Sequence, residues 1–337
     1  VGTQCPFPQL VDAMADWAAQ HTSVQVFAQT ADGSGHWLSM EHVGFLQPDA
    51  YRRRFTEADV IVGHVGTGTI VGAMQTGKPI VCMPRRASLG EHRNDHQLAT
   101  AARFARCAGV HVVENDQELH ESLEAALASA ETSGVMAPPD AGLIKRLRAR
   151  IAEAGAQGTP KVLALASGGG HWVQLCRLLE ALKHARTVCA TTALGDAALA
   201  PDADVHRVRD GNRWNKRALL ASAWDVFRLV WRVRPDVILT TGAAPGYFAL
   251  RFGKMLGAKT IWVDSIANAE ELSLSGQKAG KYADLWLTQW PELARPEGPA
   301  FAGSVLPVFE RAEPVRGIGA APADEQPGRA SDVAAQA

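Results

Sequence analysis

Several kinds of feature are missing from this sequence, and each absence narrows the class of protein. No stretch reaches the roughly 18–20 consecutive apolar residues that a membrane-spanning helix requires, and we see no signal peptide. Lys and Arg total 34 and Asp and Glu total 35, so the formal net charge is −1. This balance gives no electrostatic argument for nucleic acid as a partner, since nucleic-acid binding usually requires a concentrated basic face.

Cysteine is scarce and irregularly spaced. The five cysteines form no Cys-x-x-Cys pair and lie mostly in apolar or helical stretches: Cys5, Cys82, Cys107, Cys176 and Cys189. This pattern favours buried free thiols in a reducing compartment over a disulfide framework or a zinc site.

The chain has 337 residues, of which 47% are hydrophobic, and its apolar segments alternate between strand and helix periodicity. That length suffices for two domains with separate cores. In the first half we predict strands at 24–28, 60–62, 79–83 and 110–113 and helices at 10–19, 51–57, 69–75, 95–108 and 117–130. In the second half we predict strands at 161–166, 187–191, 237–240, 260–264 and 285–288 and helices at 171–183, 216–233 and 247–256. Such alternation predicts α/β domains with parallel sheets and ligands at the carboxyl ends of the strands.

Composition suggests where the domains end. We place the first domain at residues 1–130 and a linker, which includes a basic helix, at 131–159. The second domain occupies 160–310, and residues 311–337, rich in Pro, Ala, Gly and charge, are expected to be a disordered tail. The chain starts at Val1 without a methionine, and we expect a first strand to lie upstream.

Two glycine-rich loops stand out, one in each half. Residues 64–69 read His-Val-Gly-Thr-Gly-Thr after a predicted strand, and residues 167–171 read Ser-Gly-Gly-Gly-His after another. Small residues let backbone amides approach a phosphate or sugar, and the following helix adds its positive end. The loops predict two nucleotide-fold halves that face each other and use a nucleotide-sugar; the alternative is a pair of tight turns that bind nothing.

Further motifs carry a resemblance to a known family. Residues 264–268 (Asp-Ser-Ile-Ala-Asn), 272–276 (Leu-Ser-Leu-Ser-Gly) and 289–293 (Gln-Trp-Pro-Glu-Leu), with 167–171 and 241–246, resemble the acceptor and anchor subunit of the two-subunit dolichol-pathway N-acetylglucosaminyltransferase. The first half resembles the catalytic, donor-binding subunit of that family at 1–3, 64–69, 77–79 and 92–97. Residues 83–86 and 91–97 read closer to bacterial exopolysaccharide glucuronosyl- and galactosyltransferases. The resemblance covers roughly 1–130 and 160–295, and it implies a fusion of both subunits with the GT-B glycosyltransferase architecture, two Rossmann-like domains.

The sequence departs from this family at two points. The subunit that resembles the second half usually carries an N-terminal membrane helix, which is not found at that place here. In the wider family a Glu after the glycine loop often binds the ribose, whereas Gly72 aligns there and Glu91 is a weak substitute.

For the donor, the resemblance implies a UDP-sugar held by the first glycine loop and by residues before the next predicted helix. Arg85 suits a diphosphate or a donor carboxylate; an exposed basic loop and a solvated helix start are the open alternatives. The expected donor-binding residues are His64, Gly66, Thr67, Gly68, Thr69, Arg85, Glu91, Asn94, His96 and Gln97.

For the acceptor, the second glycine loop and the ends of neighbouring strands are expected to bind a polyprenyl-diphosphate-linked saccharide. His171 at a helix start is disfavoured as a cation, which keeps it available as a base, although it could instead bind acceptor phosphate or cap the helix. Asp264 is the second candidate base, or else a loop anchor acting through Ser265. The expected acceptor-binding residues are Ser167, Gly168, Gly169, Gly170, Arg213, Gly242 and Ser265.

The helix predicted at 216–233 is rich in Arg and Trp. Such a helix suits an anionic membrane interface, and it equally suits packing on a sheet.

These observations predict an inverting UDP-sugar glycosyltransferase of exopolysaccharide or lipid-linked oligosaccharide synthesis, peripheral at the cytoplasmic face of the plasma membrane. We expect no cofactor besides the UDP-sugar substrate. No Asp-x-Asp pair follows a strand of the first half, so we expect no metal; backbone amides and cations would hold the leaving diphosphate. Glucuronate, galactose and N-acetylglucosamine are the donor candidates, and the basic pair Arg85 and Arg86 favours glucuronate. A membrane-anchoring partner is a further expectation. The alternatives are a non-catalytic scaffold that recruits another transferase and a UDP-sugar 2-epimerase.

Overall fold

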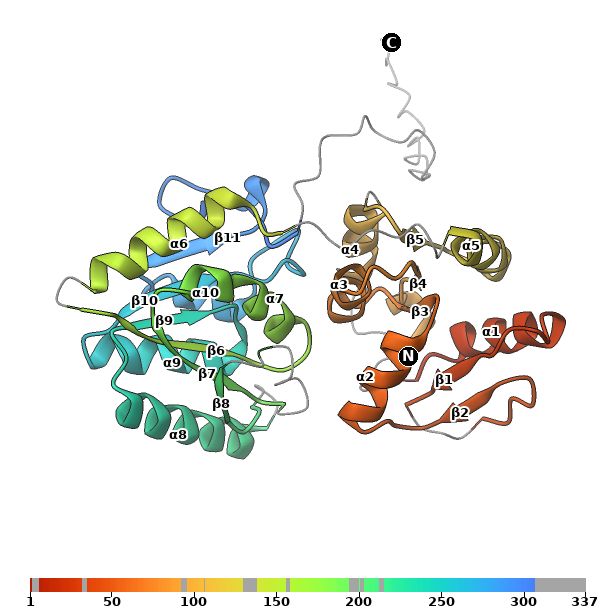
Figure 1. Ribbon diagram of the computed structural model, residues 1–337, viewed down its shortest axis with the longest axis horizontal. Helices are drawn as coiled ribbons and strands as arrows, with labels where there is room; N and C mark the ends of the chain where they lie inside the picture. Colours follow the sequence, from red (N-terminus) through yellow and green to blue (C-terminus); the bar gives the residue numbers. More distant parts are fainter. Residues whose placement is uncertain are drawn as a thin grey trace, which may run out of the picture.

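The computed structural model describes residues 1, 6–31, 35–91, 96–105, 107–129, 138–155, 158–193, 200, 203–211 and 215–306. Within them the chain forms two parallel α/β units that face each other (Figure 1). This is the GT-B arrangement of two Rossmann-like domains that the sequence predicts. The predicted tail at 311–337 lies outside the described residues.

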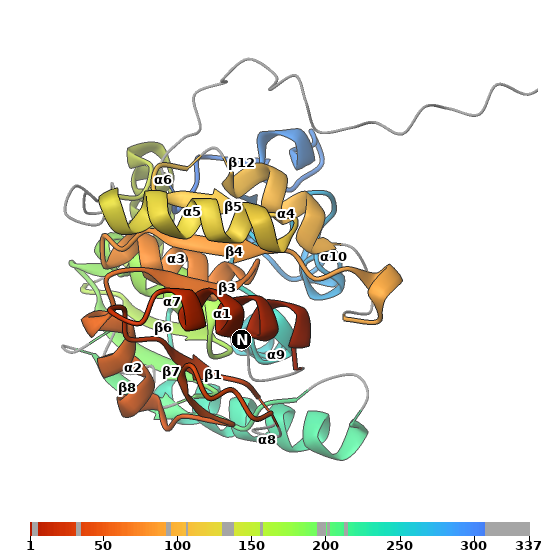
Figure 2. The ribbon, with the colours of Figure 1, turned by 90° about the vertical axis from the view of Figure 1, so that its right-hand side faces the viewer.

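The N-terminal unit has a three-stranded parallel sheet of β3 (Ile61–His64), β4 (Ile80–Met83) and β5 (Val110–Val112). A separate parallel pair consists of β1 (Phe27–Gln29) and β2 (Glu41–Val43). A cavity of about 930 Å³ is lined by residues of β1 and β3. The helices are α1 (Pro8–Gln20), α2 (Pro48–Glu57), α3 (Thr67–Gln75), α4 (His96–Phe104) and α5 (Asp116–Ser129). Figure 2 shows α1 and α5 on the outer side of this unit, whereas α3 faces the other unit in Figure 1.

The C-terminal unit has a seven-stranded parallel sheet in the order β12-β11-β10-β9-β6-β7-β8. The bounds are β6 (Lys161–Ala166), β7 (Arg186–Thr191), β8 (Asp204–Arg207), β9 (Val237–Thr240), β10 (Lys259–Val263), β11 (Leu285–Thr288) and β12 (Ala300–Phe301). The order runs one way from β6 to β8 and the other way from β9 to β12, so the crevice between β6 and β9 is the switch point where such sheets bind ligands.

The helices of this unit are α6 (Ala141–Ala154), α7 (Gly170–Leu178), α8 (Lys216–Val233), α9 (Ala243–Met255) and α10 (Leu274–Ala279). The helix α6 lies within the predicted linker, yet its apolar face is buried in the core of the C-terminal unit through Leu143, Ile144, Leu147 and Ile151. The backbone amide of Asp140, just before α6, also donates to the carbonyl of Ser304. This helix is therefore part of the second unit, a role that the Pro-rich and Gly-rich flanks concealed.

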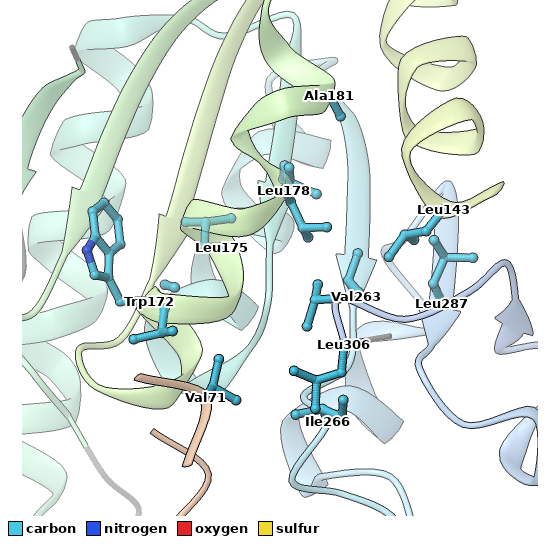
Figure 3. Close-up of a cluster of buried hydrophobic side chains, with 14 of the residues drawn as sticks. Val71, Leu143, Trp172, Leu175, Leu178, Ala181, Val263, Ile266, Leu287 and Leu306 are labelled. Carbon is cyan, nitrogen blue, oxygen red and sulfur yellow. The ribbon is translucent and has the colours of Figure 1, made fainter. Parts of the chain in front are cut away.

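One buried cluster connects the two units. It joins Val71 of α3 to Trp172 and Leu175 of α7 and continues to the core between α6 and the sheet (Figure 3). The units thus share apolar surface beside their glycine loops.

Three of the predicted buried thiols, Cys82, Cys107 and Cys189, are buried, and burial raises the pKa of each to about 12.

Candidate active site

Three helices begin with a glycine N-cap around one place, and none has a side-chain cap. The N-caps are Gly66 for α3, Gly169 for α7 and Gly242 for α9. A Cβ atom on Gly68 would lie 3.1 Å from the backbone nitrogen of Gly170, so α3 and α7 meet across the two units. Amides at such helix starts are suited to an anionic group, because they are not used within the helix and carry the positive end of the dipole.

His171 lies at this meeting point, in the first turn of α7. Its Nδ1 is 2.9 Å from the carbonyl oxygen of Thr241, and the Thr241 hydroxyl donates back to the carbonyl of His171 at 2.6 Å. The ring packs on Gly242, where a Cβ atom would lie 3.0 Å from Cε1 and where φ is +126°. Glycine is therefore required at position 242 for two reasons: a side chain would press on the His171 ring, and the positive φ disfavours other residues.

The protonation state of His171 follows from these contacts. Since a carbonyl oxygen only accepts, Nδ1 carries the hydrogen in this bond, and Nε2 is the nitrogen able to take a proton. Burial lowers the pKa of His171 below its ordinary 6.5, with the Thr241 carbonyl and the Asp264 charge acting in the opposite direction. The imidazole is thus neutral near pH 7, as a general base must be.

Asp264 follows β10 and is buried, and its carboxylate accepts four hydrogen bonds. Oδ1 accepts from Trp262 Nε1 and Ser273 Oγ, each at 2.9 Å, and Oδ2 accepts from Asn268 Nδ2 at 3.1 Å and the Ser273 amide at 3.2 Å. Burial raises its pKa, against these bonds. The geometry makes Asp264 an anchor of its loop, and Gly276 is needed because a Cβ there would lie 2.4 Å from Oδ1.

Ser265 is buried and bound within the protein, a position that argues against the predicted contact with an acceptor. Its Oγ accepts from Gln174 Nε2 at 2.9 Å, and Gln174 Oε1 accepts from the Ile266 amide and from Gln289 Nε2. Gln289 Oε1 then accepts from the Val305 amide at 2.9 Å. Sequence reasoning missed this amide network; its one signal was the Gln of the Gln-Trp-Pro-Glu-Leu motif.

On the donor side, His64 folds over the first glycine loop. A Cβ on Gly66 would lie 2.6 Å from His64 Nε2, so a side chain at this position would require the ring to move. Thr67 and Thr69 are half-buried in the first turn of α3, close to Gly68 and the meeting point of the units.

Arg85 is 3% exposed, and its guanidinium donates to the carbonyls of Pro6 at 3.0 Å and Glu91 at 3.3 Å. The ring of Phe7 lies 4.8 Å from Arg85 Cζ. Gln97 Oε1 accepts from the Arg85 amide at 3.0 Å, and Glu91 Oε2 accepts from the Arg86 amide at 2.9 Å. These three predicted donor ligands hold one loop together, which argues against a contact of Arg85 with a diphosphate.

The structure describes some of the remaining predicted site residues and not others. The Gly168 amide donates to Thr192 Oγ1 at 2.9 Å, and Ser167 is half-buried directly after β6. The backbone of His96 begins α4. The predicted contacts of Asn94 and Arg213 lie outside the described residues. In the described part of the chain, no three His, Cys, Asp or Glu side chains gather as metal ligands would.

A second contact between the units lies on α4. Arg103 Nη1 is 3.1 Å from Glu292 Oε1, and its guanidinium lies over the Trp290 ring at 4.7 Å. Both partners belong to the Gln-Trp-Pro-Glu-Leu motif, so this motif joins the acceptor-side loop to the donor-side helix.

Comparisons with known proteins find a separate match for each of the two units. Residues 205–303 match the model "Oligosaccharide biosynthesis protein Alg14 like", and residues 3–141 match "Glycosyltransferase family 28 C-terminal domain". The human UDP-N-acetylglucosamine transferase subunit ALG14 is 30% identical over 39% of this chain and 76% of its own length. The Yarrowia lipolytica subunit is 27% identical over 40% of this chain and 76% of its own length.

Among solved structures, MurG of Acinetobacter baumannii is similar at 13% identity with a TM-score of 0.37, over 44% of this chain and 47% of that one. Among the described helices, none combines the length and apolar character that crossing a bilayer demands. The relation to the human subunit covers more than two thirds of that protein, and the family 28 match accounts for the unit in front of it. The chain therefore belongs to the Alg14 family, and its N-terminal unit matches the C-terminal domain of glycosyltransferase family 28.

Proposed function

We propose that this protein transfers a sugar, with inversion, from a UDP-sugar to a polyprenyl-diphosphate-linked saccharide in exopolysaccharide or lipid-linked oligosaccharide synthesis. The observation that carries the proposal is the meeting of α3 and α7 at His171, with one glycine-capped helix start from each unit. The matches to a glycosyltransferase domain and to subunits named for UDP-N-acetylglucosamine transfer support it.

In this reaction the acceptor hydroxyl attacks the anomeric carbon while the bond from that carbon to the UDP oxygen breaks. His171 Nε2 takes the hydroxyl proton, and the nearby charge of Asp264 stabilises the imidazolium that forms. The amides at the start of α3 would stabilise the charge that develops on the departing diphosphate. No cofactor or metal is required, because amides take the place of a cation.

The proposal also includes the donor sugar and the location of the protein in the cell. The names of the relatives favour N-acetylglucosamine as the sugar. The buried position of Arg85 removes the reason to prefer glucuronate. A lipid-linked acceptor would bring the protein to the cytoplasmic face of the plasma membrane as a peripheral protein.

Transfer of labelled sugar from UDP-N-acetylglucosamine, UDP-galactose and UDP-glucuronate to polyprenyl-diphosphate-glucose, with EDTA present, tests the proposal. We expect label in the organic phase from one donor and its loss in His171→Gln. UDP binding without transfer to this or any other lipid-linked acceptor would support a non-catalytic scaffold instead.

A further inference from the structure

Helix α8 has apolar side chains on two opposite faces. Its buried face packs on the sheet through Val226, Leu229 and Val230. A second stripe, Leu220, Trp224, Phe227 and Trp231, repeats at spacings of four, three and four residues. Of these, Leu220 is 71%, Trp224 57% and Trp231 52% exposed. A water-facing helix normally has a polar outer face, so this stripe requires an explanation.

The stripe is held in a fixed arrangement. The Phe227 ring lies 5.8 Å from Trp224 and 6.1 Å from Trp231, and it meets Phe252 of α9 edge-on at 5.4 Å. Figure 1 shows α8 along the outer edge of the C-terminal unit. The tryptophans are thus presented outward by an aromatic cluster that the fold keeps in place.

A basic pocket of about 370 Å³ lies beside the stripe, between β8 and α8. His206, Arg207, Arg228 and Arg232 line it together with Trp231. Arg232 Nη2 lies 3.4 Å from His206 Nδ1, so the two side chains are held together at one wall. The pocket offers several cationic donors directly next to an exposed indole.

The carboxylates near the pocket are already paired. Asp225 lines it and receives two bonds from the Arg209 guanidinium, at 2.6 and 2.7 Å, and Asp204 Oδ2 is 3.2 Å from His206 Nε2. Together, β8 and α8 carry five lysine or arginine side chains against these two aspartates. The face is therefore locally positive although the whole chain is nearly neutral.

We infer that this face docks on an anionic lipid bilayer, with Leu220, Trp224 and Trp231 in the interface and a lipid phosphate in the pocket of His206, Arg207, Arg228 and Arg232. Indole rings favour the headgroup level, and arginines attract anionic lipids over a short range. The combination distinguishes a bilayer from free phosphate, which would use the pocket without the stripe. This inference shares with the proposed function only the lipid nature of the acceptor, and its test needs no transfer activity.

The test is co-sedimentation of the full chain with vesicles, without any sugar nucleotide. Vesicles of phosphatidylcholine mixed with phosphatidylglycerol are compared with phosphatidylcholine alone. One variant, Trp224→Ser with Trp231→Ser, removes the indoles, and another, Arg228→Glu with Arg232→Glu, reverses the pocket charge. Lys145→Glu with Arg146→Glu, on the exposed side of α6, makes the same charge change elsewhere. Circular dichroism and thermal melting verify that each variant is folded.

We expect binding to the mixed vesicles that exceeds binding to phosphatidylcholine. One basic side chain near an anionic surface contributes about fivefold to partitioning, so the pocket variant should lose at least roughly 25-fold. The indole variant should also lose most binding, and the α6 variant should lose much less than the pocket variant. The inference would be overturned if the wild-type protein did not bind the mixed vesicles, or if the pocket and α6 variants lost binding equally. So would inorganic phosphate binding with no vesicle binding.

Discussion

Gly68 and Gly170 meet backbone to backbone across the two units. A Cβ atom on Gly68 would lie 3.1 Å from the Gly170 nitrogen, and one on Gly170 would lie 3.2 Å from the Gly68 nitrogen. Side chains at either position would separate the two helix starts that flank His171. The two glycine loops are thus parts of one interface.

Gly68→Ala should reduce kcat/KM by roughly tenfold or more, because displacements well under 1 Å at reacting groups are costly. The matched control is Gly72→Ala in the same helix, where the new Cβ would meet Phe55 Cζ at an ordinary 3.4 Å. That control should keep its activity and gain up to about 1 kcal/mol of stability from helix propensity. Equal activities of the two variants in the transfer assay would show that the glycine contact is not needed.

His171→Gln should lower kcat by about 10²- to 10⁴-fold, the usual contribution of a general base. Because burial holds the pKa of His171 below 6.5, wild-type activity should fall on the acid side only below that pH. The unfolded chain binds this proton more readily, so stability from the neutral ring is present above 6.5 and is lost as pH falls toward the lowered pKa. The control is the pH–rate profile of the residual activity of His171→Gln. If that activity declines at acid pH as the wild-type activity does, the decline belongs to another group.

Asp264→Asn should destabilise the protein by about 1–3 kcal/mol, because an amide NH₂ cannot accept from the donors that meet the carboxylate. Its control is Asp225→Asn, which breaks a surface pair and should cost about 1 kcal/mol or less. Urea unfolding measures both. Since burial raises the Asp264 pKa, the stability from its protonated form is full below 3.8 and is lost as pH rises through the raised value. The Asn variant should lack this pH-dependent part; an unchanged unfolding curve would count against the anchor role.

Arg103→Ala should loosen the turn at Pro291–Leu293 while changing global stability by no more than about 1–2 kcal/mol, since one exposed ion pair and one cation–π contact are lost. Hydrogen exchange of the Leu293 amide, which donates to the Trp290 carbonyl at 3.1 Å, reports the loosening. Arg148→Ala removes a pair of the same 3.1 Å length with Glu180 inside the C-terminal unit. That control should leave exchange at Leu293 unchanged, and similar exchange in both variants would remove the bridging role from Arg103.

Much of the fold could be predicted from local patterns. The predicted helix at 216–233 has the bounds that the structure shows, because a long segment with clear apolar periodicity indicates its own secondary structure. The strand predicted at 237–240 also has the observed bounds, since its Val-Ile-Leu run is apolar and largely β-branched. The short β2, β8, β12 and α10 were missed, and the strand predicted at 24–28 lies at Phe27–Gln29. These short segments contain no apolar run, and they have too few residues for a period to appear.

The sequence by itself determined two α/β halves, each with a glycine loop at a strand end, and placed His171 among the candidate bases. Only the tertiary structure decided that Arg85, Gln97 and Ser265 serve the protein interior, that Asp264 anchors a loop through Ser273, and that α6 belongs to the second unit. Residue type and spacing reveal which groups are able to bind or react. Whether a polar side chain faces a ligand or another part of the chain depends on partners far away in sequence, such as Pro6 for Arg85.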